Sequence, residues 1–290
     1  MMTRNLIRIT VLSLLLFSLT GSLWAATLTV NYSDIVLENL QPGVPVSLLQ
    51  RTGRALGVNN IDTLGANVFF DILIPNKNQL VEGYEPIPDI KWLKTERINS
   101  WIKANQSDNF DLVIYAPYDQ KLFGKKYQAI LMVYALEGIG MLKSHIKTKV
   151  LLSFTAERYK IDALDQKINE DQTNNKIIMI YPKITSVAEV NLKKKLDFSR
   201  LVVTNNSTEK IALTLYAIVL GNIPTEAGLV KFKNPSIELN NKESRSIDLT
   251  IDFPLLKLRK SQPMLVFIGI KDTKNTQGIG QFGLLKMQFD

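Results

Sequence analysis

The chain lacks cysteine altogether and contains one histidine, His145, among its 290 residues. Without cysteine there is no disulfide, no thiolate nucleophile and no thiolate ligand for a metal. A structural zinc site needs several Cys or His ligands, and a serine nucleophile would have only His145 as its base. We therefore predict no catalytic residue, no cofactor and no metal, and an exposed strand position for His145.

Long apolar runs are missing after the first 25 residues, which differ from the rest. Arg4 and Arg8 precede the apolar stretch ITVLSLLLFSLTGSLW, and small residues follow it. This order is typical of an export signal, so we predict a signal peptide over residues 1–25, cleaved after Ala25. The alternative is an uncleaved anchor, but the run falls short of the roughly 20 residues that span a bilayer. We expect no membrane span after cleavage and an exported protein, either periplasmic or at the cell surface or secreted.

Charge is modest and of positive sign. Charged residues make up 21% of the chain, hydrophobic residues 46%, and the net charge is +8. These proportions indicate a folded protein. The basic stretches KKK (residues 193–195) and KLRK (residues 257–260) would suit an anionic polymer of a cell envelope, with solvated loop lysines as the alternative. Export argues against nucleic acid as a partner.

Long helical periodicity is also missing, and an internal repeat takes its place. The stretch DLVIYAPYDQKLFGKKYQAILMV, residues 111–133, returns in outline as DLTIDFPLLKLRKSQPMLVFIGI, residues 248–270. Apolar residues alternate in both copies, and a proline ends each first strand at Pro117 and Pro254. Alternation places Leu112 toward a core and Asp111 toward water, as in a half-buried strand.

The repeat extends in both directions. The sequence GIG recurs at 138–140 and 278–280, and asparagine pairs at 59–60 and 205–206 each precede an apolar strand. Turn-forming residues recur at short intervals, as in an all-β sandwich. Chance agreement of two β-rich halves is the alternative, and the shared order of turn, strand and loop argues against it.

These patterns predict an all-β chain of two tandem immunoglobulin-like antiparallel β-sandwich domains. We place domain 1 at 26–156, a polar linker at 157–176 and domain 2 at 177–290, with a short helix over 163–168. The stretch IKWLKTERINSWIKAN, residues 90–105, has a loosely helical pattern, but the repeat predicts a strand at its end.

A family resemblance follows from GYEPIPDIKWL (residues 83–93), the 111–133 stretch and GIG. Together they resemble exported bacterial immunoglobulin-like tandem β-sandwich proteins, distantly similar to periplasmic pilus-assembly chaperones. The resemblance implies a role in interaction without catalysis. Pilus chaperones add a strand to an incomplete sheet of their subunit. Their basic anchor pair has no counterpart that we can place here, so no residue roles are carried over.

Aromatic residues are the best candidates for a binding surface. Trp101 falls opposite in phase to Ile102, which predicts an outward side chain. The predicted interaction surface has four members that lie near one another in sequence: Trp101, Tyr84, Tyr115 and Tyr118. Such a group suits a sugar ring or a partner chain. The alternative is that the YEPIP loop covers Trp101 and that Trp92 belongs to the core.

The sequence thus predicts a non-catalytic structural or protein-interaction module of the bacterial cell envelope or surface. The alternative is a periplasmic pilus-type chaperone that binds an exported β-rich subunit by strand addition. A carbohydrate-binding or enzymatic protein is the third class. The expected partner is a protein or an envelope polymer, and the oligomeric state stays open.

Overall fold

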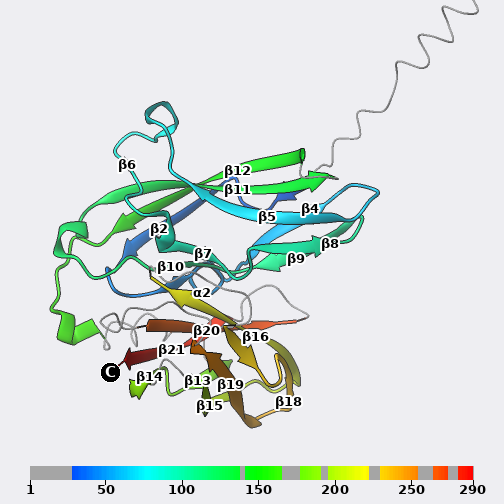
Figure 1. Cartoon of the computed structure of the whole chain (residues 1–290), viewed down its shortest axis with the longest axis vertical. Coiled ribbons are helices and arrows are strands. Elements are labelled where there is room, and N and C mark those ends of the chain that lie inside the picture. The colour runs from blue at the N-terminus through cyan, green and yellow to red at the C-terminus, as the bar shows by residue number, and fades with distance from the viewer. Residues whose placement is uncertain are drawn as a thin grey trace, which may run out of the picture.

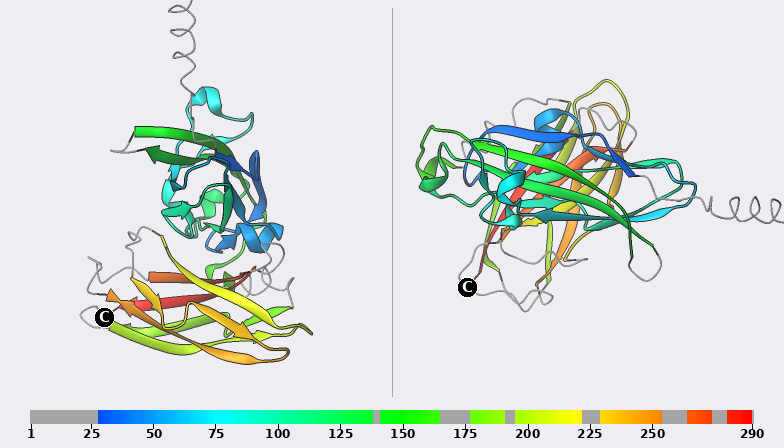
Figure 2. Two further views of the ribbon diagram at one scale, coloured as in Figure 1. Left: turned by 90° about the vertical axis from the view of Figure 1, so that its right-hand side faces the viewer. Right: turned by 90° about the horizontal axis from the view of Figure 1, so that it is seen from above.

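The computed structural model describes residues 28–137, 141–164, 177–190, 195–221, 229–253, 264–273 and 280–289. The predicted signal peptide and most of the predicted linker lie outside these residues. The described chain forms two tandem immunoglobulin-like β-sandwiches, which lie one above the other in Figures 1 and 2. We call residues 28–164 the first half and residues 177–289 the second half.

One layer of the first half is a sheet in the order β2-β12-β11-β5-β8, with β6 paired to β11. Its strands are β2 (Asp34–Leu40), β5 (Ala66–Leu73), β6 (Glu85–Pro86), β8 (Asn99–Ile102), β11 (Lys126–Glu137) and β12 (Met141–Phe154). The β2–β12 pairing is parallel, and β11 pairs antiparallel with both β5 and β12.

The opposite layer consists of two short sheets, β1-β4-β9 and β3-β10-β7. Their strands are β1 (Leu28–Val30), β3 (Val46–Ser47), β4 (Leu56–Asn60), β7 (Leu93–Thr95), β9 (Gln106–Phe110) and β10 (Leu112–Ile114). Short helical segments join the strands of this half: α2 (Leu48–Thr52), η1 (Lys77–Gln79), η2 (Ile90–Trp92), η3 (Gln120–Leu122) and η4 (Ile161–Ala163).

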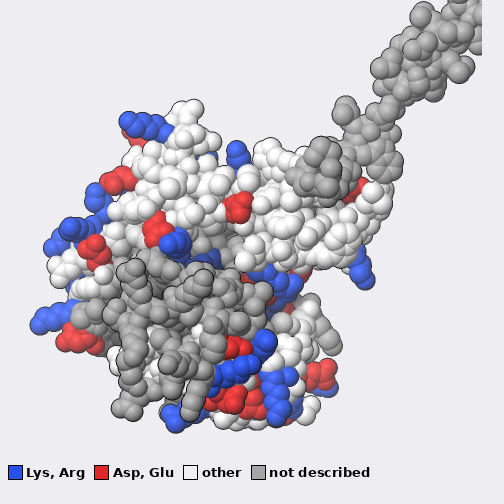
Figure 3. All heavy atoms as spheres, in the orientation of Figure 1, with Lys and Arg blue, Asp and Glu red and all other residues white. Residues whose placement is uncertain are grey.

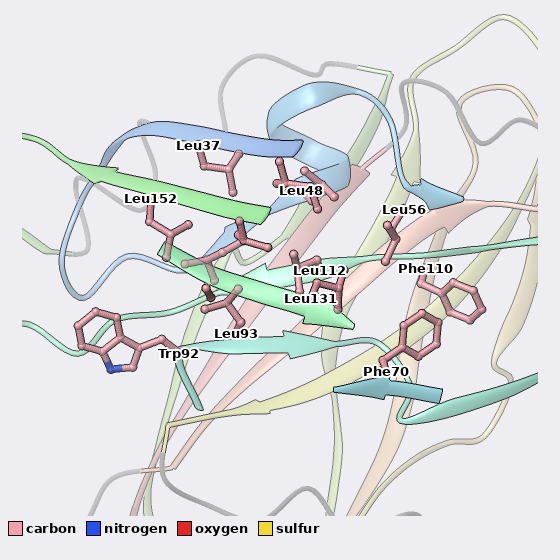
Figure 4. Packing of buried hydrophobic residues seen from close by; sticks show 14 of the residues in the cluster. Leu37, Leu48, Leu56, Phe70, Trp92, Leu93, Phe110, Leu112, Leu131 and Leu152 are labelled. Carbon is pink, nitrogen blue, oxygen red and sulfur yellow. The ribbon is translucent and has the colours of Figure 1, made fainter. Parts of the chain in front are cut away.

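Apolar side chains from both layers form the core of the first half, as Figure 4 shows. The members drawn there and labelled are Leu37, Leu48, Leu56, Phe70, Trp92, Leu93, Phe110, Leu112, Leu131 and Leu152. Trp92 packs edge-on against Tyr127 and Phe154, so the sequence-based alternative that placed Trp92 in the core is confirmed. Since the chain has no disulfide, burial of these side chains is the main source of stability.

The second half repeats this arrangement with sheets β13-β15-β19-β17 and β14-β21-β20-β16-β18. The first contains β13 (Ile178–Tyr181), β15 (Lys195–Asn205), β17 (Val230–Phe232) and β19 (Ser244–Asp252). The second contains β14 (Ile184–Val190), β16 (Ile211–Leu220), β18 (Ser236–Leu239), β20 (Met264–Asp272) and β21 (Gly280–Phe289). Its core is separate from that of the first half.

Strand register shows that the two halves are copies of one plan. Leu93 pairs with Ile114 between β7 and β10, and Val230 pairs with Ile251 between β17 and β19. The residues that match in the repeat therefore also match in their partners. The stretch at 90–105 ends in strand β8, and its counterpart ends in β18, as the repeat predicted.

One fully buried asparagine occupies the same corner in each half. Asn60 ends β4 and Asn205 ends β15, and both side chains are inaccessible to solvent. Each side-chain amide donates to three backbone carbonyls at equivalent positions: Leu64, Ile102 and Lys103 for Asn60, and Glu209, Leu239 and Asn240 for Asn205. The amides bind the turn after the strand to the end of β8 or β18.

One prediction from the repeat is wrong for the first copy. Alternation placed Asp111 and Val113 on a water-facing side, but both are fully buried. Their face is covered by the second half. The matching Asp248 is exposed, as predicted, and lies near Lys233. A single strand pattern cannot show which outward face a second sandwich will cover.

Candidate binding site

Among the described residues, no group of His, Asp or Glu side chains has the geometry to hold a metal ion. His145 lies in β12 with an exposed side chain, as predicted. In the same part of the chain no helix is long and apolar enough to cross a membrane. Surfaces are the other candidates for a binding site, and the contact between the halves comes first.

The two halves meet through an apolar interface. Tyr216, Ile218 and Phe267, on the outward face of the second half's β16 and β20, pack with Val44 and Val113 of the first half. Tyr216 pairs with Gly269 across the sheet, and a Cβ at that glycine would lie 2.1 Å from the tyrosine ring. Glycine at this position lets the Tyr216 ring lie across β20 and point into the interface.

Asp111 is the centre of a buried polar network in this interface. Its carboxylate accepts hydrogen bonds from Ser47 Oγ at 2.5 Å, from the Leu49 amide at 3.0 Å and from Tyr216 Oη at 2.5 Å. Burial raises the pKa of Asp111, while the hydrogen bonds oppose this rise. Burial and the Asp111 charge together raise the pKa of Tyr216 well above its usual value.

An ion pair lies beside this network. Lys271 Nζ donates to both carboxylate oxygens of Glu96, at 2.9 and 2.8 Å, and to the Asn109 carbonyl at 3.0 Å. Lys94 Nζ donates to the Val219 carbonyl across the interface, and burial lowers the pKa of Lys94 to about 8. Lys94 and Lys271 thus both have partners across the interface. This contact therefore holds the two halves of the chain together and leaves neither lysine for a ligand.

A different feature is one edge of β12, part of which no other described strand pairs with. This strand has 14 residues, and β11 pairs along its length. On the other side β2 pairs only from Lys149 to Phe154. Within the part of the chain that the structure describes, no strand pairs with this outer edge from Met141 to Thr148. Such an edge presents alternate backbone N–H and C=O groups that are ready to pair.

Side chains alternate along the open edge. Thr148 is buried and Ile146 packs partly against the core, whereas His145 and Lys147 are exposed. Charged residues on an edge strand hinder uncontrolled pairing. In the sequence KSHIKTK, residues 143–149, every second residue is Lys or His, a pattern that could have indicated an edge strand. The unpaired part of the edge follows only from where β2 begins to pair with β12.

The predicted aromatic residues do not form one surface. Tyr84 is half-buried against Ser153 near the start of β11, where β6 pairs. Trp101 lies in β8, which pairs with the part of β5 next to the end of β11. This position is roughly 27 Å along the strand from the start of β11, where Tyr84 lies. Tyr115 is half-buried in the interface between the halves. Tyr118 packs with Phe123 and Tyr159.

Trp101 alone among these four is largely exposed, at 65%. The outward orientation predicted for it agrees with the structure, and the YEPIP loop does not cover it. In Figure 3, charged residues of both signs are interspersed on the visible face of the second half, whereas much of the first half is uncharged. The lysines of the second half include Lys195 and Lys210, which pair with Asp252 and Glu238.

Comparisons with known proteins concern the fold. No protein-family model matches this chain, and no curated protein matches it in sequence. Solved structures do match. The Escherichia coli chaperone DraB shares 12% identity at a TM-score of 0.31, with 91% of this chain and 97% of that one covered. A protein of unknown function from Porphyromonas gingivalis shares 11% identity at a TM-score of 0.30, with 90% and 99% covered.

A third match is the chaperone–tip adhesion subunit complex CsuC–CsuE of Acinetobacter baumannii. It has 12% identity and a TM-score of 0.32, with 91% of this chain and 100% of that one covered. Two of these matches are pilus-assembly chaperones, the class of proteins that the sequence resembles. At such identities and TM-scores they support no conclusion about this chain, and its fold and site are argued from its own residues.

Proposed function

We propose that this protein is an exported, non-catalytic interaction protein of the cell envelope. It binds an extended segment of another exported protein by strand addition at the open edge of β12. The observation that carries the proposal is the edge from Met141 to Thr148, with which no strand of the described residues pairs. Export is supported by the sequence of residues 1–25.

The length of the edge suits this role. The β11–β12 hairpin has strands of 12 and 14 residues, while the equivalent β20 and β21 have 9 and 10. Within the described residues the paired hairpin of the first copy therefore extends further than that of the second. An added strand that pairs with the open edge would gain backbone hydrogen bonds over this extension.

The chemistry of the edge defines the partner. An added strand would place alternate side chains over Ile146, where apolar residues fit best. Its remaining side chains would lie beside His145 and Lys147, which favours Asp or Glu at those positions. The expected segment alternates apolar and acidic residues. A permanent envelope partner and a subunit in transit both satisfy this description.

The chain offers a direct test because it has no native cysteine. A Ser144→Cys variant carries one thiol in the open part of β12 and accepts a photo-crosslinking maleimide. The matched control is Ser236→Cys, which places the thiol on β18, an edge strand of the second half. Both variants are expressed in the native host and labelled with the maleimide. The intact cells are then irradiated, and the protein is purified.

We expect a discrete protein adduct from Ser144→Cys that is weak or absent for Ser236→Cys. A single stable envelope protein in the adduct identifies a permanent partner. A secreted subunit whose adduct disappears after a chase identifies chaperone activity. No adduct, or the same adducts from both variants, would show that the edge of β12 is not the binding site.

A further inference from the structure

One end of the first half carries exposed apolar side chains. Ile61, Leu64 and Trp101 are 53%, 59% and 65% exposed, and we call these three residues the tip cluster. Ile61 and Leu64 belong to the turn between β4 and β5, and Trp101 lies in β8. Leu142, near the end of β12 where it pairs with Leu136, is also exposed.

The tip cluster is held in a fixed shape. The buried side-chain amide of Asn60 donates to the Leu64 carbonyl and to the Ile102 carbonyl at the end of β8. The backbone amide of Asn105 donates to the Asp62 carbonyl. The Trp101 ring covers Gly65, where a Cβ would lie 2.4 Å from the indole. Glycine at position 65 therefore allows the indole to lie against the turn.

The second half shows that the fold does not require these apolar residues. Asn205 there occupies the position of Asn60, with the same hydrogen bonds. The positions that match Ile61, Leu64, Gly65 and Trp101 hold polar or charged residues: Asn206, Glu209, Lys210 and Glu238. Lys210 and Glu238 form an ion pair at 2.5 Å where the first half has indole over glycine. The apolar tip is thus a property of the first copy and not of the sandwich.

The position of the tip along the chain indicates what covers it. Strand β1 begins with Leu28, which pairs with Asn60 at this same end. The segment before it contains the apolar run from Ile9 to Trp24. In the precursor, before the predicted cleavage after Ala25, the chain therefore joins its most lipophilic segment at the tip, which places the tip next to the membrane during export. Lys103, exposed directly after β8, adds a positive charge there.

We propose that the tip cluster binds a lipid surface and holds the first half against a membrane. Trp favours the interface between lipid headgroups and acyl chains, where its ring is partly buried and its N–H stays near water. Ile61 and Leu64 are aliphatic side chains on a convex turn, and such side chains gain free energy when they leave water for the acyl region. Lys103 is placed to meet an anionic headgroup.

The test uses the chain from Ala26 onward, which keeps every described residue and removes the apolar run that would itself bind lipid. Vesicles of phosphatidylethanolamine and phosphatidylglycerol are the probe, and binding is measured by co-sedimentation. Of the three tryptophans, Trp24 is then absent and Trp92 is buried, so a blue shift in fluorescence reports on Trp101.

The informative variants are Leu64→Glu and Trp101→Glu, because the second half carries glutamate at both equivalent positions. The fold therefore accommodates them. The matched control is Tyr181→Ala, which removes an equally exposed aromatic ring from the second half. We expect each glutamate variant to weaken vesicle binding about tenfold or more, with unchanged thermal stability, and the control to bind normally.

Co-sedimentation that is equal for the parent chain, the glutamate variants and the control would overturn the proposal. So would the absence of vesicle binding by the parent chain, which would leave the tip as a protein-docking surface. A blue shift that occurs on lipid addition and disappears in Trp101→Glu supports the proposal. Because the vesicles contain no protein, the outcome is independent of strand addition at β12.

Discussion

Replacement of Lys271 by methionine removes the cation that binds Glu96 across the two halves. Lys271 is 14% exposed in its side chain and Glu96 only 2%, with 2.8 Å between nitrogen and oxygen. Glu96 would keep only Arg97, at 3.5 Å, and the Asp111 backbone amide, at 3.3 Å, and breaking a buried pair costs about 3–5 kcal/mol. The Asn109 carbonyl loses a hydrogen bond as well. We expect Lys271→Met to lower the free energy of unfolding by an amount in this range.

A matched control is available in the second half. Lys233 lies 3.8 Å from Asp248, the counterpart of Asp111 in the repeat, and the two side chains are 74% and 47% exposed. Exposed pairs of this kind contribute about 0–1 kcal/mol. Lys233→Met should therefore have little effect, although it removes the same charge.

Urea denaturation followed by far-ultraviolet circular dichroism measures both variants at neutral pH. A Lys271→Met chain whose unfolding free energy stays within about 1 kcal/mol of the Lys233→Met chain refutes the reasoning, because Glu96 would then be solvated or otherwise paired. Adding Glu96→Gln to Lys271→Met should recover part of the loss, since it removes a buried charge that has lost its closest cation.

Three further predictions follow from buried groups. Ile114→Asp and Ile251→Asp each place an unpaired charge in one core, so calorimetry should show each half lose its own transition; loss of both in either variant would contradict independent cores. The folded-state pKa of Asp111 is raised, so the parent chain should lose stability as pH rises from about the ordinary value of 3.8, whereas Asp111→Asn should lack this component; identical pH profiles in urea titrations would contradict it. Asn60→Ala and Asn205→Ala each leave buried carbonyls unpaired, so each should lower the free energy of unfolding by more than about 2 kcal/mol in the same assay. A loss below about 1 kcal/mol in either variant would contradict the equivalent structural role of the two asparagines.

The repeat was the part of the fold that sequence reasoning could predict. Alternation, prolines and turn residues are local, and they occur twice, so agreement between the copies reinforced each weak signal. Val113 shows the limit of this reasoning. Its alternation indicated water, yet it lies in the contact between the halves. Docking of one sandwich on another depends on shape across distant segments, which no local pattern records.

The candidate site was less predictable. Closeness in sequence suggested that Tyr84, Tyr115, Tyr118 and Trp101 would gather, but successive strands distributed them over different faces and ends. The open edge of β12 depends on where β2 begins, more than 100 residues earlier in the chain. The sequence predicted only an exposed strand position for His145, and the pairing of β2 showed which part of this strand has no partner among the described residues.

The most direct test of the account is hydrogen–deuterium exchange, resolved by residue, along β12 of the free protein. Between Val150 and Leu152 the strand pairs on both sides, so its amides should be protected. Between Met141 and Thr148 alternate amides point away from β11, and we expect those to exchange fast while their neighbours stay protected. Uniform protection from Met141 to Phe154 would mean that another segment already occupies the edge, and strand addition at this site would be excluded.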